Sequence, residues 1–429
     1  MKKLLLVIII AVLFTTGVTP QTLITLKECY ELATANNALS SEKEAYSSIA
    51  EIKDENLLKS WLPTLDINAS ALYNSDIVDF SDAMAAVPAM SSVFHSMPKD
   101  QYKITLDINQ TFYDGGAIKN ARAMEQAELK LNEKQVEIDE YKIRGEINAY
   151  YFNIILLGRQ KEILSNYLQL MEKRMNAMES AITNGVKLKH DMDIIKSEKI
   201  SIEQQMAEIE SKKKALMKIM SDMTGTEITD LTSFAVPEPE YRNDEELTRH
   251  ELQMFDLKRE QLSAAMKMTQ TKRLPKAFGF ATAGYGNPPG QNFLEDSFDT
   301  YYIIGAGIKW NIFDWNKTKN EKQVIAIQQG IIENRKTDMT DNIRRMLETK
   351  MSEINSLEEM IKSDEELLEL RKRISRTAES QYDNGTITAA EYMAELNAEK
   401  NAAVNSDIHR LKLALAGVEY MNLSGRDIE

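Results

Sequence analysis

The residue types that most often perform chemistry are few in this chain of 429 residues and stand far apart. The four histidines, His95, His190, His250 and His409, show no spacing typical of metal ligands. The single cysteine, Cys29, cannot form an intrachain disulfide, and we expect a small buried residue there rather than a nucleophile. No set of nucleophile, base and oxyanion donors can be assembled. The sequence therefore predicts neither an enzyme nor a metal or cofactor site.

Composition and charge narrow the class of protein. Charged residues make up 28% of the chain, and none of the nine prolines lies between Pro98 and Pro237 or after Pro289. Two long regions are therefore free to be helical, because an interior proline would remove a hydrogen bond and kink the helix. The formal net charge of −14 argues against nucleic acid as a partner, since phosphate binding needs clustered lysines and arginines.

The N-terminus has the pattern of a cleaved secretory signal. Lys2 and Lys3 precede an apolar run, Leu4 to Phe14, that is too short to cross a bilayer as a helix. We expect residues 1–20 to be removed, which would change the net charge from −14 to −16. No small-residue lipobox precedes Cys29, so lipidation is not expected. The sequence therefore predicts an exported protein.

The longest predicted element is a helical hairpin over residues 117–223, folded at Asn184-Gly185. Apolar residues on both arms alternate four and three positions apart, which is typical of the heptad seam of a coiled coil. The seam residues are Ile147, Tyr150, Ile154, Leu157, Leu164, Leu168, Met171, Met175, Met178 and Ile182, then Met192, Ile195, Ile202, Met206, Ile209, Leu216, Met220 and Met223. As one helix, the outbound arm would extend roughly 100 Å at about 1.5 Å per residue.

Strands are predicted where the apolar period changes from helical spacing to two. A polar helical stretch over residues 25–59 ends at Leu62-Pro63, and alternation then predicts a strand pair over about 63–114 with an irregular segment between the strands. Aromatic residues at both ends of the apolar face favour a membrane barrel over a soluble sandwich in an exported protein. Asp114 can cap the first long helix, and Gly115 and Gly116 permit the change of direction before it.

A second copy of this pattern follows. The first repeat spans 21–223 and a connector spans 224–243; the second repeat, 244–429, contains a helix to about 272, a strand pair at about 276–314 and a hairpin over 317–420. Asp114 and Asp314 precede the long helices, and Gly185 and Gly385 turn them, with the same offset of 200 residues. Four strands cannot close a barrel, and open strand edges are not viable in lipid. Strands in a membrane would therefore require several copies of the chain.

In order and spacing, these motifs resemble the TolC family of outer-membrane efflux channels over essentially the whole mature chain. The resemblance rests on the motifs Leu26-Lys27-Glu28, Asn36-Asn37, Leu62-Pro63, Leu274-Pro275, Phe112-Tyr113-Asp114-Gly115-Gly116, Asn184-Gly185-Val186 and Asn384-Gly385-Thr386. The resemblance implies a mixed α/β membrane protein, a homotrimer whose strands form one twelve-stranded transmembrane β-barrel in the outer membrane. An α-helical tunnel would continue this barrel across the periplasm. The Asn-Gly turns would lie at its far tip, where family members meet a periplasmic adaptor, or membrane fusion, protein and through it an inner-membrane transporter.

The resemblance also implies candidate gate residues. An acidic residue six positions after the turn glycine narrows the tip in the family, which matches Asp191 and Glu391 here. A second acidic position of some members is Ala394 in this chain, and the neighbouring Glu395 would face about 100° away on the helix. From the residues alone, Asp191 and Glu391 also fit the ordinary solvated face of a charged coiled coil.

Two functions remain open from the sequence. The first is a passive outer-membrane exit duct that conducts small molecules, or proteins, supplied by a partner pump. The second is a periplasmic structural or adaptor coiled coil without a pore, which would have no need of repeated apolar strand faces. The seam methionines favour packing over a metal relay, because methionine fills irregular gaps. The transported substrate cannot be read from the sequence.

Overall fold

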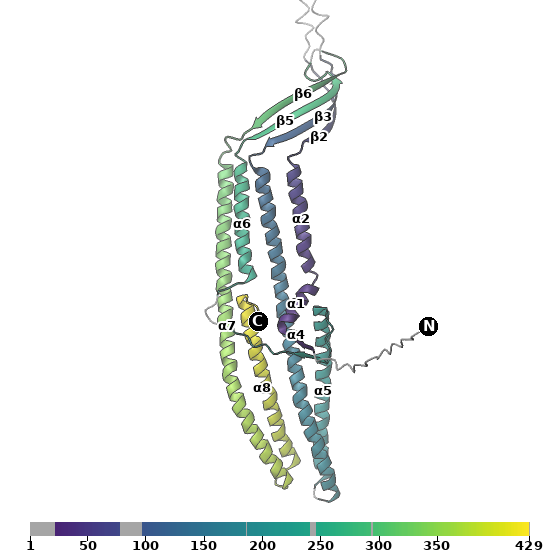
Figure 1. The fold of residues 1–429 in the computed structure, drawn as a ribbon, viewed down its shortest axis with the longest axis vertical. Coiled ribbons are helices and arrows are strands. Elements are labelled where there is room, and N and C mark those ends of the chain that lie inside the picture. The colour runs from purple at the N-terminus through teal and green to yellow at the C-terminus, as the bar shows by residue number, and fades with distance from the viewer. Residues whose placement is uncertain (1–21, 78–96, 186, 241–245, 293–294, 429) are drawn as a thin grey trace, which may run out of the picture. The chain divides into compact units, whose positions relative to one another are not determined.

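The computed structural model describes residues 22–77, 97–185, 187–240, 246–292 and 295–428 (Figure 1). The expected signal, Val186 and most of the irregular segment between the first two strands lie outside the described residues. Contacts divide the chain into two compact units. The hairpin unit comprises the residues up to Asn37, Glu140–Leu247 and Arg344–Glu429, and the sheet unit comprises Ala38–Asp139 and Thr248–Ile343.

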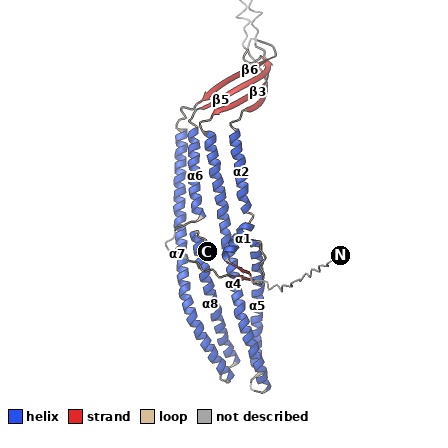
Figure 2. Cartoon of the chain, in the orientation of Figure 1, coloured by secondary structure: helices blue, strands red, loops and turns tan. Residues whose placement is uncertain are grey.

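Helices predominate in the sheet unit as in the rest of the described chain (Figure 2). The unit contains α2 (Ser40–Lys59), α6 (His250–Thr271) and the first parts of α4 (Ala117–Thr183) and α7 (Lys317–Asp383). The helix expected from about 244 begins only at His250, shortly before its first buried side chains, Leu252 and Met254. Most helical stability comes from packing an apolar face, and the described residues 246–249 contain a single apolar side chain, Leu247. No described helix is long and apolar enough to cross a lipid bilayer.

Four antiparallel strands form the main sheet, in the order β2 (Thr64–Tyr73), β3 (Asp100–Tyr113), β5 (Lys276–Asn287) and β6 (Asp299–Lys309). Both predicted strand pairs are confirmed, although β6 ends at Lys309, before the predicted limit of about 314. Thr64 lies opposite Asn109, and Lys276 lies opposite Lys309. All four connections to helices α2, α4, α6 and α7 therefore leave the same end of the sheet, the junction end.

One face of this sheet is apolar and exposed. It consists of Leu65, Ile67, Ala69, Ala71 and Tyr73 of β2, Tyr102, Ile104, Leu106 and Ile108 of β3, Ala281, Ala283 and Tyr285 of β5, and Tyr302, Ile304, Ala306 and Ile308 of β6. The side chains of Ile67 and Ile304 are 75% and 76% exposed. A contiguous exposed apolar surface marks an interaction site, because leaving it in water costs about 25 cal/mol per Å².

The other face of the sheet is largely polar. The Asp107 carboxylate of β3 accepts hydrogen bonds from the hydroxyls of Thr282 (2.5 Å) and Thr105 (2.7 Å) and from the amide of Asn68 (2.8 Å). These partners come from β5, β3 and β2, so the network ties three strands together on this face. The alternation of apolar and polar residues in the sequence thus corresponds to a sheet with one apolar face and one polar face.

The hairpin unit contains two long helical hairpins. The first consists of α4 and α5 (Lys189–Thr224), and the second of α7 and α8 (Ala389–Ser424). Helices α4 and α7 each have 67 residues, and α5 and α8 each have 36. The outbound lengths agree with the sequence prediction, whereas the second return arm ends at Ser424 rather than near 420.

The predicted seam of the first hairpin is confirmed, since each of its residues is buried or half-buried. Lysines at the skipped heptad positions form ion pairs between the arms instead. Lys161 contacts Glu210, and Lys199 lies 3.2 Å from Glu172. The hydrogen bond to Glu172 raises the pKa of Lys199 above its ordinary value. Charged side chains therefore replace the missing apolar knobs without breaking the coiled coil.

The segment expected as one helix over 25–59 is divided. It forms α1 (Leu26–Asn36) in the hairpin unit and α2 in the sheet unit. The Asn36 side chain donates hydrogen bonds to the carbonyls of Asp222 (3.0 Å) and Met223 (3.2 Å), near the end of α5. Asn37 is extended, and α1 therefore ends where its last residue caps another helix.

Two short parallel strands, β1 (Thr22–Ile24) and β4 (Thr232–Phe234), were not expected from the sequence. The hydroxyl of Tyr151, on α4, donates hydrogen bonds to the carbonyls of Ile24 (3.0 Å) and Ala235 (2.6 Å). Tyr151 and Cys29 are fully buried in the same apolar cluster, as expected for the cysteine. Burial raises the pKa of the Cys29 thiol to about 12. The connector after α5 is thereby fastened to the first hairpin.

Candidate functional site

The two Asn-Gly turns end the outbound helices in the same way. Gly185 and Gly385 adopt left-handed conformations, with φ of +75° and +73°. The Gly185 amide donates to the carbonyl of Ile182 (2.9 Å), and the Gly385 amide donates to that of Tyr382 (3.1 Å). Glycine adopts this conformation without steric cost, which explains its use as a helix stop. Asn184 and Asn384 are exposed at these tips.

The second turn has an additional closing hydrogen bond. Both the backbone amide and the hydroxyl of Thr386 donate to the carbonyl of Gln381, each at 2.9 Å. The corresponding residue of the first turn, Val186, lies outside the described residues. The exposed turn at Gly385-Thr386 therefore has a defined backbone geometry.

Asp191 and Glu391 occupy equivalent positions, the third residue of each return helix. Their surroundings differ. Asp191 is half-buried, and Leu188 before α5 provides no side-chain cap. Glu391 is exposed and completes a capping box with Thr388. The two gate candidates are therefore not interchangeable.

The capping box fixes the Glu391 carboxylate. It accepts hydrogen bonds from the Thr388 amide (2.8 Å) and hydroxyl (3.0 Å), while the Glu391 amide donates to the Thr388 hydroxyl (3.2 Å). The backbone hydrogen bond from Thr388, followed by that from its hydroxyl, lowers the pKa of Glu391 below its ordinary value of 4.5. Ionised Glu391 thus satisfies helix donors that would otherwise lack partners.

This geometry predicts a pH-dependent tip. A carboxyl whose pKa is lower in the folded chain stabilises the fold when ionised, so the contribution is present above about pH 4.5 and is lost as the pH falls through the folded value. We expect Thr388→Val to accelerate amide hydrogen exchange at the start of α8 near neutral pH, measured by mass spectrometry. The difference from the native chain should shrink in acid. An equal difference at every pH would contradict the prediction.

The two hairpins pack together near their tips. One apolar cluster contains Met171, Met178, Ile195 and Ile202 of the first hairpin and Tyr382, Tyr392, Met393 and Leu396 of the second. The Tyr382 and Tyr392 rings stack with centroids 5.4 Å apart. Arg174 of α4 bonds to Asp383 (3.1 Å), contacts Glu379 and lies over the Tyr392 ring. The first seam is therefore only part of the contacts of its hairpin.

Asp191 belongs to this contact between hairpins. Burial and then the charge of Asp191 raise the pKa of Tyr382 to about 12. Lys187 also reaches across, with its ammonium 3.9 Å from the centroid of the Tyr382 ring and bonded to the Tyr382 carbonyl. Sequence reasoning missed Arg174, Lys187, Tyr382 and Tyr392, because none of them belongs to a motif. Their roles arise from packing between segments about 200 residues apart.

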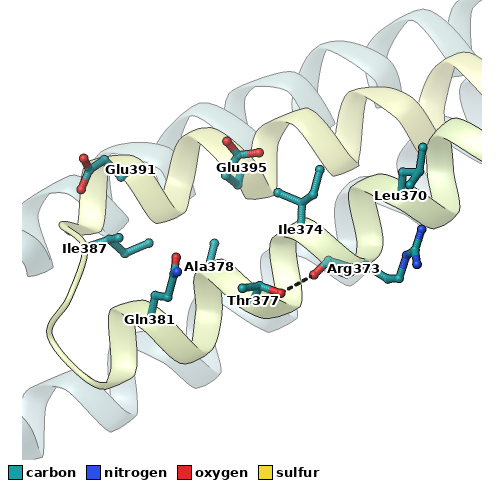
Figure 3. Close-up of a pocket in the computed structure, with 9 residues that line it drawn as sticks. All are labelled: Leu370, Arg373, Ile374, Thr377, Ala378, Gln381, Ile387, Glu391 and Glu395. Carbon is teal, nitrogen blue, oxygen red and sulfur yellow. Dashed lines mark hydrogen bonds between the residues drawn. The ribbon is translucent and has the colours of Figure 1, made fainter.

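Glu391 and Glu395 border a groove of about 590 Å³ on the second hairpin (Figure 3). Its apolar lining comes from Leu370, Ile374, Ala378 and Ile387, with Arg373, Thr377 and Gln381 beside them. Arg371 lies 3.4 Å from the Glu395 carboxylate. The structure thus places an open, partly apolar groove beside one gate candidate. Among the described residues, no cluster of three or more histidines, cysteines or acids could hold a metal ion.

The strand-to-helix junctions carry the remaining site candidates. Asp114 is buried and accepts hydrogen bonds from the amides of Gly116 (2.7 Å) and Ile118 (2.5 Å). Gly115 and Gly116 are left-handed, and a Cβ on Gly115 would stand 2.8 Å from the Cβ of Leu274. Asp114 is therefore the helix cap that the sequence predicts, and Gly115 is required by a close approach.

The second junction has the same geometry with different residues. Asp314 accepts a hydrogen bond from the Thr318 amide (2.9 Å), as Asp114 does from Ile118. Trp315 and Asn316 adopt left-handed conformations, with φ of +54° and +63°, where the first junction has two glycines. A large residue in this conformation costs roughly 1–2 kcal/mol. The sequence did not predict this backbone strain. The repeat matches Asp314 to Asp114, but Trp315 and Asn316 do not have the glycines that would indicate left-handed conformations.

We expect Asp114→Ala to destabilise the sheet unit by about 1–2 kcal/mol, because two amides at the start of α4 would lose their acceptor. Guanidinium unfolding followed by tryptophan fluorescence measures this directly, since all three tryptophans belong to the same unit. Asp114→Asn keeps one side-chain oxygen and should lose less. Equal unfolding midpoints for the native and alanine chains would contradict the role of Asp114 as a cap.

Comparison with known proteins agrees with this architecture. No family model and no curated protein sequence matches the chain. Among solved structures, it is similar to the Campylobacter jejuni CmeC outer membrane channel, with a TM-score of 0.63, 14% identity, and coverage of 93% of this chain and 85% of that chain. The Neisseria gonorrhoeae MtrE outer membrane channel gives a TM-score of 0.66, 13% identity and coverages of 94% and 89%. The Vibrio cholerae outer membrane protein VceC gives a TM-score of 0.61 and 17% identity, with coverage of 94% of this chain and 97% of that chain.

These likenesses extend over nearly the whole chain at low identity, so they establish the fold. The chain has the fold of the TolC-family outer-membrane channels, and the resemblance seen in its motifs is confirmed at that level.

Proposed function

We propose that this protein is the outer-membrane exit duct of a tripartite efflux system and conducts substrates passively. The observation that carries the proposal is the exposed apolar face of the main sheet, opposite a polar face built around Asp107. A strand pattern with one face toward lipid and the other toward a water-filled lumen is typical of transmembrane barrels. The expected signal at 1–20 supports export to this location.

The open edges of the sheet support assembly from several copies. In the described sheet, β2 and β6 are the two edge strands, with 10 and 11 residues. Unpaired backbone groups are not viable in lipid, so a membrane-inserted sheet must close. Because the sheet is antiparallel with an even number of strands, β6 of one copy can pair antiparallel with β2 of the next. Three copies would give the twelve-stranded barrel that the family resemblance implies.

The helices beside these edges point to the same assembly. Exposed apolar side chains occur on α2 and on the first part of α7, namely Ile49, Ile52, Leu58, Val324, Ile327 and Ile331. A neighbouring copy that paired with the sheet edges would also cover helices of the sheet unit. The left-handed pairs at 115–116 and 315–316, together with the equal helix lengths, support our reading of the chain as two sequential repeats, 21–223 and 244–429.

The turns at Asn184-Gly185-Val186 and Asn384-Gly385-Thr386 are the proposed docking tips for a periplasmic adaptor, which would connect the duct to an inner-membrane transporter. The partner pump would supply the energy for transport. The pump would also determine the substrate. The groove beside Glu391 and Glu395 lies next to the second turn and has the mixed apolar and charged lining that a helical partner requires.

We also propose Asp191 and Glu391 as gate residues of the assembled tip. Like carboxylates that converge in a narrow pore repel one another and attract cations. The double variant Asp191→Ala with Glu391→Ala should therefore increase single-channel conductance and lose cation preference in a planar bilayer. Glu391 also belongs to the capping box of α8, so alanine could disturb the helix as well as remove the charge. The variant Glu391→Gln with Asp191→Asn removes the charges but keeps most of the hydrogen bonding, and it should lose cation preference as the alanine variant does. Unchanged conductance and selectivity in both variants would refute the gate.

Cell fractionation tests the channel against a pore-free periplasmic coiled coil. We expect a heat-modifiable trimer in outer-membrane fractions, with discrete conductance steps after reconstitution. Recovery of the protein in the soluble periplasmic fraction would instead support the structural alternative.

A further inference from the structure

All three tryptophans of the chain lie at the junction end of the sheet. Trp61 connects α2 to β2, and Trp310 and Trp315 connect β6 to α7. Trp310 and Trp315 are 56% and 84% exposed, and the intervening Ile312 and Phe313 are exposed as well. Large apolar side chains thus gather outside the sheet, immediately beyond the apolar face that ends at Ile308. Tryptophan is enriched where membrane proteins pass from the bilayer core into water.

Contacts within the sheet unit hold these side chains in place. The Trp310 indole N–H donates to the carbonyl of Arg273 (3.0 Å), and the Arg273 guanidinium donates to the carbonyl of Ile312 (3.4 Å). Phe313 and Trp315 pack edge to face with centroids 4.9 Å apart. Trp315 keeps a left-handed backbone although its side chain is mostly exposed. The connections α6–β5 and β6–α7 are therefore joined into one aromatic platform.

Positive charge surrounds this platform. Lys272 and Arg273 are exposed between α6 and β5, and Lys317 and Lys319 are exposed in the first turn of α7. Residues 272–276 and 309–319 contain six cations and a single acid, Asp314, which caps α7, although the whole chain has a net charge of −14. At the opposite end of the sheet, the described loops contain Asp76, Glu295 and Asp296 with one cation, Lys99, and the adjoining strands β3 and β6 begin with Asp100 and Asp299. The apolar face therefore has a basic, tryptophan-rich end and an acidic end.

We infer that Lys272, Arg273, Lys317 and Lys319, with Trp310 and Trp315, form a collar that binds the anionic headgroups of phospholipids. This inference rests on the proposed function, because the sheet must lie in a bilayer for the collar to reach its interface. A phospholipid offers both groups that the collar needs: acyl chains continue along Ile308 and Ile312, and the phosphate meets the cations. A soluble anion would leave the exposed aromatic and aliphatic side chains in water.

The strength of this preference follows from general electrostatics. Each lysine or arginine near an anionic membrane surface contributes about 1 kcal/mol, which is roughly a five-fold preference. Lys272 already lies 2.8 Å from Glu321, so the other three cations carry most of the effect. Salt should weaken the preference, since exposed charges are screened beyond about 10 Å at moderate ionic strength.

Quenching of tryptophan fluorescence by brominated lipids measures directly which lipids contact the collar, because all three tryptophans lie at the junction end of the sheet. The full chain is reconstituted into phosphatidylcholine vesicles that contain either brominated phosphatidylglycerol or brominated phosphatidylcholine in equal amounts. At low salt we expect phosphatidylglycerol to associate at least about five-fold more strongly, which is the preference that a single cation gives. The preference should approach one in the variant Lys272→Gln, Arg273→Gln, Lys317→Gln and Lys319→Gln. It should persist when four exposed α5 lysines, Lys196, Lys212, Lys214 and Lys218, are changed to Gln.

The outcomes distinguish failure of the headgroup site from failure of the proposed membrane channel. Equal quenching by the two lipids in the native chain, or an unchanged preference in the collar variant, would overturn the headgroup site while leaving a membrane channel intact. Protein that floats with the vesicles but is quenched by neither lipid would show that the collar contacts a protein instead, which also overturns the inference. Failure to float with any vesicle would contradict the proposed function itself.

Discussion

Replacing Ile304 by lysine is expected to prevent stable insertion of the protein into the outer membrane. The Ile304 side chain is 76% exposed on the apolar face of β6, with Ala281 of β5 and then Ile108 of β3 opposite it across the sheet. A lysine on the lipid face near the bilayer midplane costs about 2–4 kcal/mol, and every copy in the assembly carries the same penalty. We expect Ile304→Lys to reduce the heat-modifiable oligomer in outer-membrane fractions to a small part of the native amount.

The neighbouring residue provides a matched control. Ile303 is the same residue type on the same strand, but it lies opposite Thr282 on the polar face of the sheet, in line with Asp107. Ile303→Lys should therefore insert and assemble nearly as well as the native chain, because a lysine there faces the polar lumen. Equal losses for Ile303→Lys and Ile304→Lys would show that the apolar face does not contact lipid.

The second large effect is expected in the hairpin unit, where Ile195→Ala should destabilise the fold by about 2–5 kcal/mol. Ile195 has no exposed surface and packs on the seam between α4 and α5. It also belongs to the cluster that joins the first hairpin to Tyr382 and Tyr392 of the second. Truncation leaves a cavity where two packing surfaces meet, so little relaxation can fill it. Guanidinium unfolding followed by helical circular dichroism measures the loss.

Ile200→Ala is the corresponding control, because Ile200 lies on the same helix and is 55% exposed. Its replacement should change the free energy of unfolding by no more than about 0.5 kcal/mol. If both alanine variants unfold at the same denaturant concentration, the heptad seam is not the main contact that holds the hairpin.

Patterns with a strong period were readable from the sequence. Heptad spacing indicated that α4 is a helix, and the motifs Asp114-Gly115-Gly116 and Asn184-Gly185 on either side of it gave its first and last residues. Period-two alternation located the four long strands and their apolar face. The three-residue strands β1 and β4 were missed, since three residues cannot display a period and their pairing depends on Tyr151. The break after Asn36 was missed because its cause is a hydrogen bond to α5.

The candidate site was predictable where it depends on local chemistry. Thr388 and Glu391 have the spacing of a capping box, so the sequence did contain the signal for the fixed Glu391 carboxylate, and the same signal occurs at Thr25 and Glu28. Contacts such as Arg174 with Asp383 could not be predicted, because they depend on how two hairpins pack. The cationic collar was also hidden, since its members come from two segments about 40 residues apart.

The central claim is that copies of this chain close a barrel by pairing β6 of one copy with β2 of the next. Disulfide trapping in intact outer membranes tests it most directly, with Asn68→Cys on β2 combined in turn with Tyr301→Cys, Ile303→Cys or Gly305→Cys on β6. Within one chain these strands are separated by β3 and β5, roughly 14 Å apart, which is too far for a disulfide. Cys29 is fully buried, and its raised pKa of about 12 keeps the native thiol unreactive.

At one register we expect oxidation to give covalent dimers and trimers, with no larger species, because a third disulfide closes the ring. The matching single-cysteine variants should remain monomeric under denaturing conditions. Monomers at every register, or a ladder that continues beyond three copies, would contradict the closed trimeric barrel.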